Sequence, residues 1–364
     1  MNLWSLLFLF WSTDAFAFPE LSRHGYVNCT ACHVSPSGGG LLTQYGRGIS
    51  KDLLSTWAKE GEEQFAYGLL TPHERIVMAA YFRGLQLHQE DASLREGRPI
   101  LMQADLEAGY MGDSGAVVAS IGNQEVREAT GGTRGRLFSR RHYAFYRLGD
   151  AHHFRVGRFQ LFYGLNDPNH FLSVRRDLGL GQDMESYNTE YAYLGENLNV
   201  YLTGTFGNFN DSFSRNREKA VSASASYFFA EKNKVGFSTL RGGDDQTDRT
   251  LGGLWAIISW FPRFFTMSEA DYQWKSSLGR SQRGYVTSHK LHYEVIQGLI
   301  PFFLFERSFL DSNLPSSQRT AYGLGVQFFP RPHFEVLGQW QRDQLDRVSE
   351  SVIDTAWLML NFYL

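Results

Sequence analysis

The sequence predicts an all-β protein: a transmembrane antiparallel β-barrel of about sixteen strands, preceded by a short segment of mostly irregular and helical structure. Apolar and polar residues alternate with period two through most of residues 75–364, as in strands with two different faces. Connections between these stretches alternate between long and short, which is typical of barrels in bacterial outer membranes. Aromatic residues make up 15% of the chain, which suits the aromatic belts of membrane proteins.

Residues 1–17 are predicted to be a signal peptide. An apolar run from Leu3 to Trp11 is followed by Ala15-Phe16-Ala17, a small-residue cleavage pattern, so the mature chain would start at Phe18. The region before the apolar run has no Lys or Arg, unlike most signal peptides. An uncleaved anchor is the alternative, but the run is short for a bilayer span.

The strand prediction rests on segments such as residues 99–110. There Met102, Ala104, Leu106, Ala108 and Tyr110 would face lipid, while Gln103, Asp105, Glu107 and Gly109 would face a wet lumen. The same pattern places strands at 76–89, 99–110, 114–124, 138–149, 152–164, 185–195, 197–208, 219–230, 233–241, 250–261, 263–275, 284–297, 299–309, 319–329, 332–342 and 352–364.

The connections between these strands predict the orientation of the barrel. Connections after odd-numbered strands are long, including 165–184, 242–249 and 276–283, and those after even-numbered strands have one to three residues. Outer-membrane barrels have short periplasmic turns and long outer loops. Both ends of the mature chain therefore fall on the periplasmic side. A large soluble β-protein, the alternative, would not need this asymmetry.

The two cysteines of the chain fall in one motif, Cys29-Thr30-Ala31-Cys32-His33. C-x-x-C-H is the attachment pattern of c-type haem, in which both thiols form thioethers and the histidine is the proximal iron ligand. A disulfide or redox pair is one alternative. A zinc site is another, although it would need further ligands from histidines. The formal net charge of −3 gives no indication of nucleic-acid binding.

Residues 18–74 are predicted to form the haem-bearing segment. The turn Pro36-Ser37-Gly38-Gly39-Gly40 can approach a cofactor closely because its glycines lack side chains. Ser50 is predicted to cap a helix that runs to about Glu60, with Gly61 as its stop. So short a segment needs extra burial, from the haem or from the mouth of the barrel.

The second axial ligand of the haem is less well specified. His24 is the first candidate, because it is the only other histidine before residue 70, and His73 is the second. Met78 and a lumen-facing His88 are weaker candidates, and a five-coordinate iron is a further option.

Ionisable residues on the predicted inner face could attract metal cations, or could simply line a water-filled pore. They are Asp105, Glu107, Glu190, Glu269, Asp271, Lys290, His292 and Glu294. The loop 165–184, with His170, Arg175 and Arg176, could fold inward as a constriction or partner site, or remain a plain outer loop.

In motif and architecture, the chain resembles the fused monohaem cytochrome–porins of bacterial outer membranes. In residues, the resemblance is specific at Cys29-Thr30-Ala31-Cys32-His33 and the Pro/Gly turn after it. It implies one covalent haem c, outer-membrane lipid around the barrel, and electron transfer between extracellular iron(II), or another donor or acceptor, and periplasmic cytochromes. The haem segment would then lie on the periplasmic side or within the lumen.

Three functions remain open from the sequence. The first is an electron conduit, a cytochrome-type oxidoreductase without hydrolytic machinery, since no nucleophile–base triad is apparent. The second is a passive porin channel with a structural haem. The third is a sleeve for a separate multihaem cytochrome, in which the C-x-x-C pair would be structural.

Overall fold

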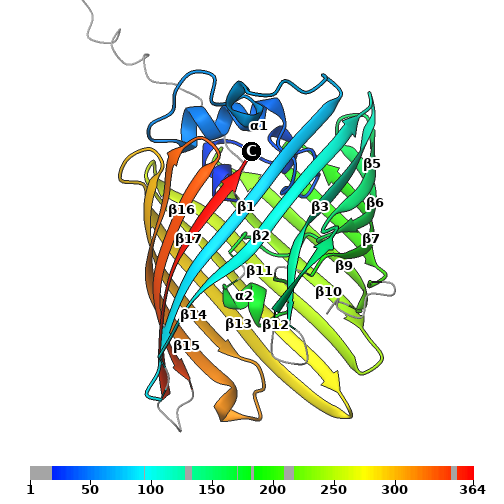
Figure 1. The fold of residues 1–364 in the computed structure, drawn as a ribbon. Helices are drawn as coiled ribbons and strands as arrows, with labels where there is room; N and C mark the ends of the chain where they lie inside the picture. Colours follow the sequence, from blue (N-terminus) through cyan, green and yellow to red (C-terminus); the bar gives the residue numbers. More distant parts are fainter. Residues whose placement is uncertain are drawn as a thin grey trace, which may run out of the picture.

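The computed structural model describes residues 19–93, 95–127, 133–169, 171–181, 184–208, 217–345 and 351–364. The predicted signal peptide, residues 1–17, lies outside these residues. Within the described part of the chain, no helix is long and apolar enough to cross a membrane. From residue 76 onward most of the regular structure is β-strand (Figure 1).

The strands form one closed antiparallel barrel. In chain order they are β1 Ile76–Glu90, β2 Arg95–Met111, β3 Gly115–Arg127, β4 Thr133–Phe138, β5 His142–Leu148, β6 His152–Phe159, β7 Ser186–Leu194, β8 Leu198–Thr205, β9 Lys219–Phe229, β10 Asn233–Gly243, β11 Thr247–Phe261, β12 Phe264–Ser277, β13 Arg280–Tyr293, β14 Leu299–Phe309, β15 Gln318–Arg331, β16 Phe334–Leu345 and β17 Ser351–Tyr363. Because β4 and β5 both pair with β3, they share one position, and the barrel has sixteen. Pairing of β1 with both β2 and β17 closes the sheet, which confirms the predicted fold class.

Two predicted strands differ from the structure. The predicted strand 138–149 begins only at His142, as β5, because residues 139–141 leave the ladder and Arg140 and Arg141 form ion pairs inside the barrel. The preceding strand β4, which ends at Phe138, lies almost entirely in the predicted loop 125–137. The predicted strand 152–164 ends at Phe159. Beyond it the chain turns into the lumen, where Tyr163 is fully buried.

Two predicted long loops are in fact tight turns. Only residues 244–246 separate β10 from β11, and Leu278 and Gly279 alone separate β12 from β13. Leu278 and Gly279 both have positive φ, as a two-residue hairpin turn requires. The strands therefore extend further than their alternation predicts, and the asymmetry of the connections is weaker than expected.

The two faces of the strands separate as predicted, with local exceptions. Asp105 and Glu107 are 4% and 2% exposed on the inner face, whereas Leu106 between them is 62% exposed. Met102 was expected to face lipid but packs against the apolar cluster inside the barrel. It is the extra residue of a bulge, since Arg83 pairs with Gln103 and Gly84 with Leu101. His88, expected in the lumen, alternates with the buried Leu85 and Leu87 and so faces outward.

Residues 19–74, here called the plug, cover the mouth of the barrel at which β17 ends (Figure 1). Its α-helix α1, Gln44–Ile49, begins after Thr43, whose hydroxyl accepts a hydrogen bond from the Gly46 amide. One wider turn, Ser50–Leu54, follows, and Ser55 is extended, so the predicted helix to Glu60 is wrong. Other short helical elements are Pro19–His24, Cys29–Ala31, Phe65–Gly68, α2 Ser173–Arg176 and Pro315–Ser317.

The plug is bound to the barrel on several sides. Arg23 forms an ion pair of 2.6 Å with Glu294, which follows β13. The Thr56 amide donates to the Phe329 carbonyl of β15 at 2.9 Å. The Val27 carbonyl accepts hydrogen bonds of 2.7 Å from Asn199 of β8 and Lys234 of β10. The plug therefore spans the mouth rather than hanging from one edge.

His333 lies beneath the plug, in the turn between β15 and β16. Its ring is fully buried and packs at 6.2 Å from Tyr67 of the plug and at 5.8 Å from Tyr363, measured between ring centroids. Burial, reinforced by the positive charge of Arg47 and opposed by Glu63, lowers the pKa of His333 to about 4. The His24 pKa is also lowered, to about 3, by burial and by Arg23.

We expect acid to loosen the plug. The pKa of His333 in the folded protein lies below the ordinary value of 6.5, so the buried ring is neutral at pH 7. The stability of the folded state is therefore highest at neutral pH and falls as the pH decreases from 6.5 toward 4, because the unfolded chain binds the proton more readily. The loss of folding free energy amounts to about 3 kcal/mol. Proteolysis of the plug in detergent-solubilised protein should be faster at pH 4.5 than at pH 7, with an acid-stable protease. His333→Asn should reduce this pH effect, while the exposed His73→Asn should leave it unchanged; equal pH dependence in both variants would refute the role of His333.

Candidate functional site

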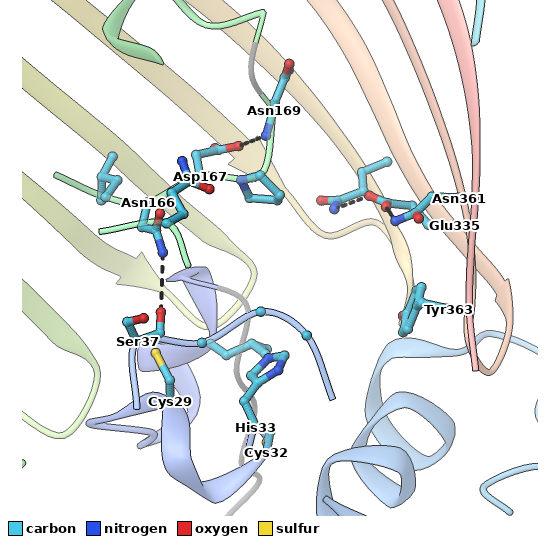
Figure 2. Close-up of a pocket in the computed structure, with 18 of the residues that line it drawn as sticks. Cys29, Cys32, His33, Ser37, Asn166, Asp167, Asn169, Glu335, Asn361 and Tyr363 are labelled. Carbon is cyan, nitrogen blue, oxygen red and sulfur yellow. Dashed lines mark hydrogen bonds between the residues drawn. The ribbon is translucent and has the colours of Figure 1, made fainter. Parts of the chain in front are cut away.

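The Cys29–Ala31 turn places the three motif residues on one cavity. The amides of Cys32 and His33 both donate to the Cys29 carbonyl, at 3.2 and 2.9 Å. This tight turn lets Cys29, Cys32 and His33 line a chamber between the plug and the barrel interior. Figure 2 shows the Cys29 thiol and the His33 imidazole on the chamber side of the plug.

Glycines allow the chain to fold closely around the motif. Gly38, Gly39 and Gly40 all have φ between 67° and 81°, a region that other residues adopt at a cost. A Cβ on Gly38 would lie 3.1 Å from the Cys29 sulfur. A Cβ on Gly46 of α1 would lie only 2.3 Å from the Cys32 carbonyl oxygen. The turn after the motif and α1 therefore pack directly against the two cysteines.

Arg155 of β6 fixes the loop after the motif to the barrel wall. Its guanidinium donates to the hydroxyls of Ser35 and Ser37 at 2.7 Å each, and pairs with Glu190 at 2.6 Å. The guanidinium carbon also lies 3.6 Å from the ring centre of Phe159. Arg155 is 3% exposed and Glu190 is 2% exposed. Removal of the charge on Arg155 or on Glu190 would therefore leave the other charge buried and unpaired.

The chamber has a volume of about 380 Å³, which is within the range of cofactor and ligand pockets. Its apolar walls include Phe162, Trp255, Ile257, Phe302, Leu337 and Trp357. Its basic groups include Arg140, Arg141, Arg175, Lys234 and Lys290. Acidic side chains, namely Asp167, Glu185 and Glu335, line it as well, so the chamber combines apolar walls with charged groups of both signs.

The segment from Gln160 to Gly181 crosses the barrel interior and forms the other side of the chamber. The Leu165 amide donates to Glu269 at 3.0 Å, and the Ser173 amide donates to Glu306 at 2.6 Å. Asn166 donates to the Ser37 carbonyl at 3.3 Å, which joins this segment to the motif loop (Figure 2). Of the two orientations considered for the 165–184 loop, the inward one is observed.

The three basic residues predicted in that loop have different environments. Arg175 is buried and donates to the Tyr163 carbonyl and to Asn166, both at 3.2 Å. Arg176 is 43% exposed at its side chain and pairs with Asp177. His170 lies outside the described residues.

Most of the predicted lumen-lining ionisable residues are held in hydrogen bonds or ion pairs. Glu107 pairs with Arg141 at 2.7 Å, and Glu190 pairs with Arg155. The other pairs and hydrogen bonds are Asp105 with Arg140, Lys290 with Asp167, Glu294 with Arg23, Asp271 with Tyr163 and Glu269 with the Leu165 amide. His292 is 4% exposed on the chamber wall. These charges hold the plug and the inward segment in place, rather than forming an open acidic row.

The arginine partners were missed by the sequence analysis. Arg140, Arg141 and Arg155 are 35, 34 and 35 residues from the carboxylates that they bind. The signal in the sequence is an inward-facing Arg155 in β6 and the Arg140-Arg141 pair near the start of the predicted strand 138–149.

Neither predicted distal ligand lines the chamber. His24 is partly buried elsewhere in the plug, and His73 is exposed, its Nδ1 accepting a hydrogen bond from the Arg75 amide. Met78 is 37% exposed on the outer face of β1. The chamber is instead lined by Met267, His292 and Met359 from the barrel wall.

The donor set at the motif is chemically compatible with the covalently held haem that the sequence predicts. Both cysteines are free. Burial raises the pKa of Cys32 to about 12 and also raises that of Cys29, whereas reactive redox cysteines have lowered values. No group of three or more His, Cys, Asp or Glu residues suited to a metal ion occurs within the described residues.

Comparison with solved structures identifies the fold. The outer-membrane channel DcaP of Acinetobacter baumannii superposes with a TM-score of 0.56 at 12% identity, over 79% of this chain and 97% of that chain. OprB of Pseudomonas putida superposes with a TM-score of 0.60 at 10% identity, over 79% of this chain and 94% of that chain. The anion-selective porin from Comamonas acidovorans superposes with a TM-score of 0.58 at 9% identity, over 79% of this chain and 99% of that chain. The fold is therefore that of the outer-membrane porins.

No protein-family model matches the sequence, and no curated protein matches it. The three structural matches leave about a fifth of this chain without a counterpart.

The packing of α1 against the motif gives a test with a matched control. We expect Gly46→Ala to loosen the plug, because the new methyl group must displace the Cys32 backbone, at a cost of about 1–3 kcal/mol. A cost of about 2 kcal/mol, in the middle of this range, would speed proteolysis of the plug roughly thirtyfold when cleavage follows the open population.

The control is Gly48→Ala in the same helix, where nothing lies within 4 Å of the new Cβ. It should leave the proteolysis rate unchanged or lower it, since Ala favours helix over Gly. Equal rates for the two variants would contradict the close packing of α1 on Cys32.

Proposed function

We propose that this chain is an outer-membrane barrel that carries one covalent c-type haem inside its periplasmic mouth and passes electrons between an extracellular partner and periplasmic cytochromes. The observation that carries the proposal is that Cys29, Cys32 and His33 line one chamber in the barrel interior. A porin fold without such a motif would suggest solute passage alone.

The outer surface of the barrel supports a position in lipid. Leu106, Val117 and Leu254 alternate with inward residues and are 62%, 62% and 70% exposed. Aromatic residues cluster near the plug-side ends of the strands: Tyr110, Tyr227, Trp260 and Tyr293 are all at least half exposed. Girdles of this kind mark the membrane interfaces of β-barrels.

The residues that would hold the haem are defined by the motif. Cys29 and Cys32 would form the two thioethers, and His33 would be the proximal ligand. When bound, the haem would supply a one-electron redox centre. The chain's own contribution is to exclude water with apolar walls and to place basic side chains, among them Arg141 and Lys234, around the same chamber.

The closed interior supports electron transfer over solute passage. The plug covers one mouth, and the segment from Gln160 to Gly181 crosses the lumen beneath it. A hydrocarbon core is about 30 Å thick, so one haem near the periplasmic mouth cannot span it alone. The proposal therefore requires an external partner that reaches into the outer half of the lumen. Iron(II) is the donor that the resemblance to cytochrome–porins implies.

A passive channel is the second candidate, and a specific observation favours it. The chain is similar in structure to an outer-membrane channel, to OprB and to an anion-selective porin. In this alternative the plug would be displaced for solutes to pass, and any haem would be structural. A sleeve for a multihaem cytochrome is less consistent with a lumen that the plug and the inward segment already occupy.

We expect the protein purified from a host that matures c-type cytochromes to retain haem on a denaturing gel, because thioethers survive denaturation. Cys29→Ala together with Cys32→Ala should abolish the stain. His33→Ala should lose the native haem spectrum, whereas His73→Ala, a change at an exposed residue, should not. An unstained wild-type band in such a host would refute the haem assignment, and an unchanged His33→Ala spectrum would refute the proximal role.

We expect wild-type protein in planar bilayers to show no steady, porin-sized conductance, because the plug is held by buried ion pairs. Arg155→Gln should introduce opening events, since it leaves Glu190 unpaired and frees Ser35 and Ser37, at a cost of about 3–5 kcal/mol. Arg342→Gln, at a half-exposed ion pair with Asp354, is the control and should remain closed. Steady conductance of the wild type would favour the passive channel instead.

A further inference from the structure

We infer that His292 of β13 would supply the second protein ligand to the iron of a haem whose first ligand is His33. The inference rests on the proposed function and deepens it, because it names the barrel residue that completes the site. It replaces His24 and His73, neither of which lines the chamber.

His292 lines the same chamber as His33. Among the described residues that line the chamber, His33 and His292 are the only histidines, one on the plug and the other on the barrel wall. His292 is the second-last residue of β13, at the end of the strand nearest the plug. Glu294, which follows the last residue of β13, forms an ion pair with Arg23 of the plug.

One nitrogen of the His292 ring, Nδ1, lacks a hydrogen-bond partner within the part of the chain that the structure describes. His292 is 4% exposed, and this nitrogen is buried. A buried polar atom without a partner is unfavourable, and in a native protein it calls for an explanation such as a redox role or a bound ion. His289, on the outer face of the same strand, instead places Nδ1 3.0 Å from the Ser268 hydroxyl.

Aromatic packing fixes the orientation of the ring. Phe265 stacks on His292 with 4.5 Å between centroids and 2° between planes, and Phe302 lies at 5.5 Å. The Arg23 guanidinium lies 4.7 Å from the Phe265 centroid. Arg23 therefore connects the plug to the stack that holds His292, so docking of the plug and orientation of His292 are coupled.

Methionine is the competing ligand type. Met267 and Met359 also line the chamber and are buried, and a thioether sulfur is a common axial ligand in cytochromes c. Histidine–methionine and bis-histidine iron differ in their charge-transfer absorption and in their paramagnetic resonance spectra. The two assignments are therefore separable by spectroscopy, independently of any electron-transfer assay.

The test uses the full-length, haem-loaded protein in detergent, with absorption and paramagnetic resonance spectra at neutral pH. We expect low-spin, bis-histidine iron in the wild type. His292→Ala should keep the covalent haem stain and shift the iron to high spin, and added imidazole should restore the low-spin spectrum. His292→Met should give a histidine–methionine spectrum. His289→Ala is the matched control on the opposite face of β13 and should not change the spectrum.

Several outcomes would overturn the inference while leaving the proposed function intact. These are a wild-type protein with high-spin or histidine–methionine iron, or wild-type spectra retained in both His292→Ala and His292→Met. Loss of the low-spin spectrum in Met267→Ala or Met359→Ala, with His292→Ala unaffected, would assign the ligand to methionine. Absence of covalent haem in the wild type is a different result, because it refutes the proposed function itself.

Discussion

Closure of the sheet between β1 and β17 is the constraint on which the rest of the structure depends. It pairs the backbone of every strand and directs alternate side chains into one shared interior. Polar groups on that inner face then need partners, because the plug and the inward segment exclude water from them. Glu107, Glu190 and Glu306 find those partners in Arg141, Arg155 and Arg319.

These buried contacts also decide where the motif lies. The loop that follows Cys29-Thr30-Ala31-Cys32-His33 is held by Arg155 on one side and by Asn166 of the inward segment on the other. The motif is thus fixed by residues of the barrel, which are remote from it in sequence. A segment of this size has little core of its own, and the barrel supplies the burial that it lacks.

Much of the barrel could be predicted from the sequence, because period-two alternation reports directly on which face a residue occupies. The prediction fails where a local irregularity changes that period. Met102 enters the interior through a bulge, and residues 139–141 break a strand so that two arginines can reach carboxylates. The tight turn at Leu278 was predicted as a loop, because the ends of exposed strands carry no apolar signal.

The candidate site was only partly predictable for a related reason. Cys29, Cys32 and His33 are adjacent in sequence, so their motif is visible without a structure. The direction of the 165–184 loop depends on long-range contacts such as Leu165 with Glu269, which no local pattern encodes. Likewise, His292 was recognised as facing the lumen, but its position on the same chamber as His33 depends on how the plug docks.

The burial of Cys32 has a consequence for the order of biogenesis. Its side chain is 3% exposed, with Gly46 packed on its backbone and the chamber enclosed by the plug, the wall and the inward segment. Enzymes that attach haem need access to both thiols. A haem joined to Cys29 and Cys32, as proposed, would therefore have to be attached before the plug docks. The strand that follows the plug, β1, is also the partner of the last strand. In the proposed function, attachment of the haem and sealing of the barrel would therefore be successive steps along one polypeptide.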